Sequence, residues 1–217
     1  RRPRTIQPTM PPVQPLPLPP ATAPQATPAA GPSLVIFGLS NILSDLVDAA
    51  LANGLTVAQI CIDQPEAPGP RDVPLQARLA SWRALGVAPQ VLPLADFRPW
   101  PGALCLLGPT TPTRAGLASR LQAAHGLRFH TLVHPTAHVS PLARLGEGVF
   151  VGANSVIGPG VTLGAHVFVN RGVTVGHDTS IGAFSRLQPG SHLGSLSQIG
   201  CGVSVGIGAT LVERLVV

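Results

Sequence analysis

Residues 149–182 read VFVGANSVIGPGVTLGAHVFVNRGVTVGHDTSIG, and a six-residue period runs through them in both directions. Stepping by six from Val133 reaches an aliphatic residue every time as far as Val217. The residue after the aliphatic position is glycine in nine of fourteen hexads, and the fifth position is small or β-branched in all but the last, Leu215. A fixed period without insertions predicts a solenoid, and hexads of the form aliphatic-Gly-x-x-small-x are typical of a β-helix.

This repeat resembles the left-handed hexapeptide-repeat family. The resemblance implies that three hexads form one triangular coil, so residues 133–217 would supply nearly five coils of a left-handed parallel β-helix. We expect the aliphatic residues to stack into a narrow core with the small fifth-position residues beside them. We expect glycine at the second position to relieve tight corners, because glycine adopts backbone conformations that other residues avoid.

A different pattern precedes the repeat. Leu34–Phe37 is a short apolar strand, Leu43, Leu46, Val47, Ala50 and Leu51 recur at helical spacing, and residues 56–62 read as a second strand. Strand, helix and strand at this length predict a right-handed βαβ unit of a parallel sheet.

Further elements continue that sheet: a helix over 75–85, strands within APQVLPL and ALCLLG, and a helix over 113–125. We therefore expect an α/β Rossmann-like domain at 33–130. Only Gly38 of a GxGxxG fingerprint is present, so NAD binding is not expected.

The first 32 residues are rich in proline, which lacks the backbone donor that helices and sheets need. The sequence thus predicts a disordered tail at 1–32, the Rossmann-like domain at 33–130 and the β-helix at 131–217. We expect the β-helix to lack the last coils that the resemblance to the hexapeptide-repeat family implies.

Composition excludes several functions. The formal charge is +5 and all fourteen basic residues are arginine, so a Schiff-base or P-loop lysine is impossible. The arginines form no stripe that would indicate nucleic-acid binding. Cys61, Cys105 and Cys201 lie far apart without metal-ligand spacing, which favours a reducing cytoplasm and no metal site. No apolar run is long enough to predict a membrane span.

His177 lies at the third position of its hexad, where a side chain faces outward. With eighteen residues per coil it lies beneath Ser195 of HLGSLSQIG. Acyl transfer needs a base with a pKa near neutrality and a donor for the oxyanion. We expect His177 to supply the base and a backbone N–H near Gly194 and Ser195 to supply the oxyanion donor. Asp178 would either contact a histidine of another chain or orient His177 through a turn.

Four segments make the resemblance more specific: HPTAHVSP, GVFVGANSVIGPGV, VNRGVTVGHD and IGAFSRLQPG. Behind a Rossmann-like domain, they resemble the NeuD/PglD-type sugar O- and N-acetyltransferases. The resemblance implies that His177 is the general base, Asp178 its acid partner and Asn170 a neighbour of the acetyl group, while Ser195 occupies the position whose amide meets the thioester oxygen.

The same resemblance implies a homotrimer that uses acetyl-CoA, with active sites between subunits. The acceptor would be a sugar or nucleotide-sugar bound partly by the N-terminal turn, for which the candidates are Gly38, Ser40, Asn41 and Asp63. That turn reads GLSNILSD, which differs from the Gly- and His-containing turn common in relatives. Arg186 stands where relatives carry histidine; it would bind an anionic acceptor or a coenzyme A phosphate, or simply lie on the surface.

The same solenoid is also compatible with two alternatives to acetyl transfer. The zinc carbonic anhydrases of this solenoid pair two histidines five residues apart, and the residue five beyond His177 is Gly182. A non-catalytic trimeric scaffold or sugar-nucleotide binding module stays open, because fold alone does not establish activity.

Overall fold

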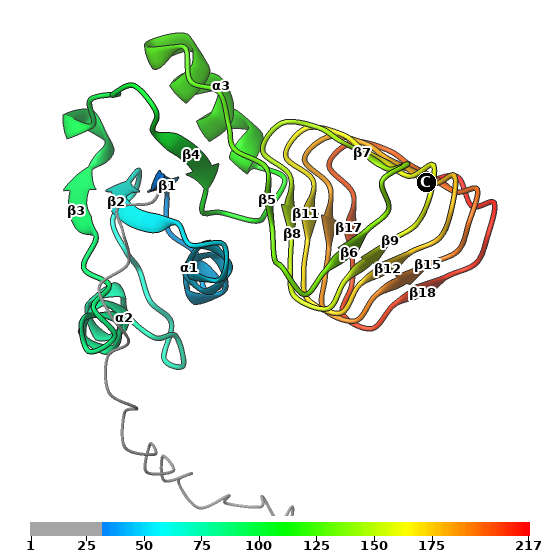
Figure 1. The fold of residues 1–217 in the computed structure, drawn as a ribbon, viewed down its shortest axis with the longest axis horizontal. Helices are drawn as coiled ribbons and strands as arrows, with labels where there is room; N and C mark the ends of the chain where they lie inside the picture. The colour runs from blue at the N-terminus through cyan, green and yellow to red at the C-terminus, as the bar shows by residue number, and fades with distance from the viewer. Residues whose placement is uncertain (1–31) are drawn as a thin grey trace, which may run out of the picture.

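The protein is described by a computed structural model that covers residues 32–217 (Figure 1). The predicted proline-rich tail lies outside the described residues except for Pro32. Among residues 32–217 no helix is long and apolar enough to cross a membrane.

The N-terminal part is a four-stranded parallel sheet in the order β3-β2-β1-β4. Its strands are β1 (Ser33–Phe37), β2 (Thr56–Ile62), β3 (Gln90–Pro93) and β4 (Leu104–Leu107). Its helices are α1 (Leu43–Ala52), α2 (Leu75–Arg83) and α3 (Arg114–His125), with a 3-10 turn at Leu94–Asp96. The predicted strand–helix alternation is therefore confirmed.

The sheet is covered on both faces because side chains alternate along a strand. Leu34 and Ile36 of β1 pack in one cluster with residues of α1 and α2, whereas Val35 and Phe37 pack with residues of α3. Two details differ from the sequence reading. The second helix ends at Arg83, where a turn begins, rather than at 85, and Leu51 is 41% exposed while Ala49 is buried in its place.

The repeat forms a left-handed β-helix with three sides, each a parallel sheet of two-residue strands (Figure 1). The first side contains β5 (Leu132–Val133), β8 (Phe150–Val151), β11 (Phe168–Val169), β14 (Arg186–Leu187) and β17 (Ser204–Val205). The second side contains β6 (His138–Val139), β9 (Val156–Ile157), β12 (Thr174–Val175), β15 (His192–Leu193) and β18 (Thr210–Leu211). The third side contains β7 (Arg144–Leu145), β10 (Thr162–Leu163), β13 (Ser180–Ile181) and β16 (Gln198–Ile199).

Paired residues on neighbouring coils are eighteen apart, as Val175 and Leu193 are, so the predicted coil length is confirmed. The aliphatic positions from Val151 to Val205 are all buried and form one continuous cluster. Fifth-position hydroxyls extend the backbone ladder inside the coil: Ser155 Oγ donates to the carbonyl of Asn170 at 2.8 Å. It also accepts a hydrogen bond from the Val173 N–H at 3.2 Å.

The expected reason for the second-position glycines is wrong. Positive φ falls instead at the fourth position of every hexad from Gly148 to Arg214, and the second-position glycines are absent from that set. Most of them are required by close approach between coils: a Cβ on Gly182, for example, would lie 2.5 Å from the backbone N of Cys201.

The first side of the β-helix packs against the N-terminal sheet and helices. Phe150 and Phe168 stack with ring centroids 5.1 Å apart and belong to the same cluster as Leu34 and Ile36. At one edge of this contact, the Arg171 Nη1 lies 2.7 Å from Asp45 Oδ1 of α1. At the other edge, Arg114 of α3 donates hydrogen bonds to the carbonyls of His166 and Ser185.

Candidate active site

His177 lies on an exposed corner, between the end of β12 and the start of β13. Asp178 follows it with φ +54°, in the left-handed region, and the chain turns there. Because of this turn the two adjacent side chains converge, and His177 Nδ1 lies 2.9 Å from Asp178 Oδ2. Of the two arrangements left open by the sequence, the structure has Asp178 contacting His177 of its own chain. Both side chains are more than half exposed, so solvent and substrate can reach the ring.

The coil above provides backbone groups at the same corner. The Leu196 N–H donates to the His177 carbonyl at 3.0 Å, which fixes the two coils in register. Gly176 has no side chain to block the space beneath Ser195: a Cβ there would lie 2.5 Å from Ser195 Oγ and 2.7 Å from its N. The Ser195 N–H donates no hydrogen bond within the part of the chain that the structure describes.

The other predicted β-helix residues lie elsewhere. Asn170 is at the preceding corner, between β11 and β12, where its side chain is 4% exposed and Oδ1 accepts from the Arg171 N–H at 2.8 Å. Arg186 lies on β14 of the first side, and its Nε donates to Ser204 Oγ at 2.9 Å. Within one chain, the structure groups His177 and Asp178 with Gly194 and Ser195, and places Asn170 and Arg186 on other parts of the coil.

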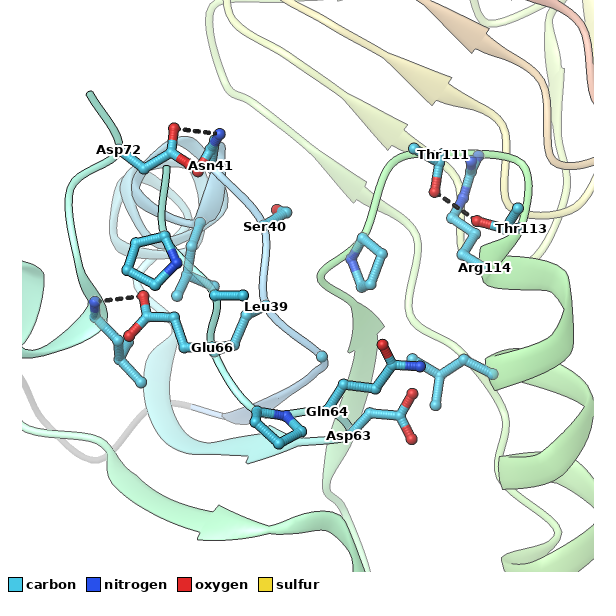
Figure 2. A pocket seen from close by; sticks show the side chains of 18 of the residues that line it. Leu39, Ser40, Asn41, Asp63, Gln64, Glu66, Asp72, Thr111, Thr113 and Arg114 are labelled. Atoms are coloured by element: carbon cyan, nitrogen blue, oxygen red, sulfur yellow. Dashed lines mark hydrogen bonds between the residues drawn. The ribbon is translucent and has the colours of Figure 1, made fainter. Parts of the chain in front are cut away.

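A pocket of about 430 Å³ opens at the carboxyl ends of the N-terminal strands (Figure 2). All four residues predicted for the acceptor turn line it: Gly38, Ser40, Asn41 and Asp63. The sheet order reverses between β1 and β4, and parallel sheets bind ligands at such a switch point. The loops after these two strands lead into α1 and α3, so two helix N-termini border the pocket.

The polar groups of this pocket are already well ordered. Ser40 Oγ donates to the Gly108 carbonyl at 2.7 Å, and Asn41 Nδ2 donates to Asp72 Oδ1 at 3.0 Å. Both oxygens of Asp63 accept from Arg120 Nη2 at 2.8 Å, so its charge is partly neutralised. The side chains of Asn41 and Asp72 face each other across the turn in Figure 2.

The sequence analysis missed three arginines in the pocket wall: Arg120, which binds Asp63, and also Arg78 and Arg114. Arg78 holds the turn through the Asn41 carbonyl at 3.0 Å and Ser44 Oγ at 2.7 Å. Arg114 is buried, and burial together with the neighbouring charge of Arg186 lowers its pKa to about 10. Neither Arg78 nor Arg114 forms an ion pair with a carboxylate among residues 32–217. No sequence signal marks these two, because their partners are backbone carbonyls and hydroxyls from distant segments.

The pocket and the His177 corner lie on opposite sides of the β-helix. The N-terminal part covers the first side, from the corner of Arg171 to the corner of Ser185. His177 occupies the remaining corner, where the second and third sides meet, at the end of the coil farthest from the sheet (Figure 1). The β-helix therefore separates the N-terminal part, which contains the pocket, from His177 of the same chain.

Comparisons with known proteins identify the repeat. Residues 142–177 match the family described as "Bacterial transferase hexapeptide (six repeats)". No curated protein sequence matches the chain.

Solved structures share the fold of the described chain. The acetyltransferase domain of PglB from Neisseria gonorrhoeae FA1090 has a TM-score of 0.66 and 24% identity, covering 85% of this chain and 93% of that one. The same domain in complex with acetyl coenzyme A has a TM-score of 0.66 and 25% identity, over 85% and 86% of the two chains. PerB from Caulobacter crescentus, in complex with CoA and GDP-perosamine, is less similar, with a TM-score of 0.43 and 23% identity over 88% and 95%.

The family match and the similarity to the PglB acetyltransferase domain confirm the resemblance to hexapeptide-repeat acetyltransferases that the sequence motifs indicated. The chain thus carries the bacterial transferase hexapeptide repeat on the fold of an acetyltransferase domain.

Proposed function

We propose that this protein is an acyltransferase that moves an acetyl group from acetyl-CoA to a hydroxyl or amine of a sugar or nucleotide-sugar. The observation that carries the proposal is the His177–Asp178 contact on an exposed corner of a hexapeptide β-helix. The similarity to an acetyltransferase domain that binds acetyl coenzyme A supports this choice of donor. Assignment to the NeuD/PglD type is part of the proposal and rests on the sequence motifs.

The chemistry follows from the groups at this corner. In this proposal Asp178 Oδ2 accepts a hydrogen bond from the Nδ1–H of His177, which leaves the lone pair on Nε2. Nε2 takes the proton of the acceptor hydroxyl or amine as that group attacks the thioester carbonyl. The Ser195 N–H stabilises the oxyanion that forms. When the carbon–sulfur bond breaks, the imidazolium returns the proton to the coenzyme A thiolate, so no covalent enzyme intermediate is needed.

The pocket at the β1–β4 switch point is the proposed acceptor site. Its volume of about 430 Å³ suits a small ligand, and the N-termini of α1 and α3 would favour a phosphate there. Gly38, Ser40, Asn41 and Asp63 supply polar contacts. Arg186, on the β-helix side facing this domain, would bind an anionic group of the acceptor or a coenzyme A phosphate.

The separation of pocket and base within one chain favours an assembly. We propose a homotrimer in which the pocket of one subunit faces the His177 corner of the next, with Asn170 near the acetyl group. In this proposal the two binding functions belong to different domains: residues 33–130 bind the acceptor and residues 131–217 bind acetyl-CoA. The free thiols of Cys61 and Cys105 fit the cytoplasmic location that we also propose.

Replacing the base tests the proposal directly. In His177→Ala we expect release of coenzyme A with a panel of sugar and nucleotide-sugar acceptors to fall by roughly 10²- to 10⁴-fold, the usual contribution of a general base. Acetyl-CoA binding, measured by calorimetry, should change little. His192→Ala, which removes an exposed histidine one coil above on the second side, is the matched control and should retain activity.

Two outcomes would reject the proposal. Activity that survives in His177→Ala would remove the base assignment. Failure of the wild-type protein to bind acetyl-CoA would instead favour the scaffold or binding-module alternative.

A further inference from the structure

Gly160 lies one coil below Asp178, at the corner that carries His177. The two residues are eighteen apart, and both have positive φ, +71° for Gly160 and +54° for Asp178. A Cβ on Gly160 would lie 2.2 Å from Asp178 Oδ1 and 3.2 Å from its Cγ. The carboxylate of Asp178 therefore occupies the space that any side chain at position 160 would fill.

Backbone conformation alone does not require glycine here. The fourth hexad position has positive φ from residue 148 to residue 214, and six of its twelve residues carry side chains. Those six are Asn154, His166, Asp178, Phe184, Leu196 and Arg214. The corner conformation thus tolerates ordinary residues in this solenoid, and the distinguishing feature of Gly160 is the carboxylate above it.

The backbone of Asp178 cannot move away from a side chain at position 160, so only its side chain can move. The Asp178 N–H donates to the Pro159 carbonyl at 3.0 Å, which fixes its backbone against the coil below. The clash would therefore be relieved by rotation about the Cα–Cβ bond of Asp178. That rotation takes Oδ2 away from its position 2.9 Å from His177 Nδ1.

We propose that Gly160 is a positioning residue, which leaves room for Asp178 to hold the Nδ1–H tautomer of His177. This inference rests on the proposed acetyl transfer for its catalytic meaning, but the geometry it describes exists with or without activity. Gly160 acts through Asp178 and touches no substrate.

Gly160→Ala tests this role against Gly172→Ala. Gly172 has nearly the same φ, +66°, but nothing lies within 4 Å of the Cβ that alanine would add. Both variants carry the same backbone strain, and only Gly160→Ala collides with Asp178. We expect kcat to fall about tenfold in Gly160→Ala, since orientation of the base is lost while the base itself remains. The KM for acetyl-CoA should stay within twofold, and Gly172→Ala should match the wild-type protein.

Two further measurements separate positioning from general damage. The ¹⁵N resonances of the His177 ring report its tautomer, and the Nδ1–H form should be depleted in Gly160→Ala but not in Gly172→Ala. In an Asp178→Asn background, Gly160→Ala should cause no additional loss of kcat, because the interaction it disturbs is already gone.

The proposal is overturned if the His177 tautomer in Gly160→Ala is that of the wild-type protein, or if the loss of kcat is equally large in the Asp178→Asn background. The tautomer measurement needs no turnover. It therefore tests the geometry even if the wild-type protein has no acetyltransferase activity, an outcome that would reject the proposed function instead.

Discussion

His166 is the buried histidine of the described chain, at 4% exposure, and it lies where the β-helix meets α3. Its ring stacks on Phe184 and meets the edge of Phe129, each with centroids 4.8 Å apart. Its Nδ1 has no hydrogen-bond partner within residues 32–217. Burial, reinforced by the charge of Arg114 and partly opposed by Glu147, lowers the pKa of His166 to about 4.

This pKa predicts that acid weakens the folded state. An unfolded histidine has a pKa of about 6.5, so between pH 6.5 and 4 the unfolded chain binds a proton that folded His166 does not. The free energy of unfolding therefore falls as the pH drops through that window, by up to about 3 kcal/mol from this residue. Urea unfolding at pH 7 and pH 4.5 measures the effect.

His166→Phe is the control for this prediction. Phenylalanine already occupies the equivalent corner position at Phe184, with φ +60°, so the backbone accepts it. The variant should lose much of the stability difference between the two pH values. An undiminished pH dependence in His166→Phe would assign the effect to other groups, among them His130, whose pKa is also lowered by burial.

At the scale of the residue, the sequence could predict that His177 faces outward with Asp178 next to it, because the repeat fixes which way each hexad position points. It could not predict the contact between them, since that depends on the left-handed turn at Asp178. Nor could it predict Arg114 or His166, whose surroundings are assembled from α3, the loop before β5 and two coils.

At the scale of the element, a coil is held to its neighbours by close contact between backbones. The aliphatic core was predictable, because an unbroken six-residue period places every aliphatic residue at the same position of the repeat. The number of hexads per coil was implied by the resemblance to the hexapeptide-repeat family. The role of the second-position glycines was not, since the distance between coils cannot be read from a period. Close approach to the next coil, rather than a positive φ, explains glycine at most of these positions.

A pair of alanine substitutions tests this account of the coil. A Cβ on Gly182 would lie 2.5 Å from the Cys201 N and the Gly200 carbonyl carbon, whereas nothing lies within 4 Å of a Cβ on Gly206. Neither glycine has positive φ. We expect Gly182→Ala to lower the free energy of unfolding by about 1–3 kcal/mol, as overpacking does, and Gly206→Ala to leave it nearly unchanged or slightly raised.

Thermal and urea unfolding of both variants provide the comparison. Equal destabilisation would mean that the second-position glycines serve backbone conformation after all. A larger loss in Gly182→Ala alone supports close approach between coils as their cause.

At the scale of the whole molecule, the arrangement of the two parts decides how a site can form. Phe150 and Phe168 point outward from the first side at positions that are polar on most other strands, and they anchor the N-terminal sheet there. Hydrophobic residues at those outward positions were a usable signal for the contact. The separation of the pocket from the His177 corner could not be predicted from the sequence, because it depends on which corner of the β-helix the N-terminal part leaves uncovered.

Mixed oligomers test whether one subunit's pocket serves another subunit's base. Thr111→Trp would fill the pocket while leaving the His177 corner intact, and His177→Ala does the reverse. If these two inactive chains are co-expressed in equal amounts, each junction of a trimer joins an intact pocket to an intact base with probability one half times one half. We expect about a quarter of the wild-type activity to return.

A mixture of Thr111→Trp with Asn41→Trp, two pocket variants, should stay inactive. Native mass spectrometry verifies that mixed oligomers form. If mixed oligomers of Thr111→Trp and His177→Ala are inactive, pocket and base must belong to the same chain.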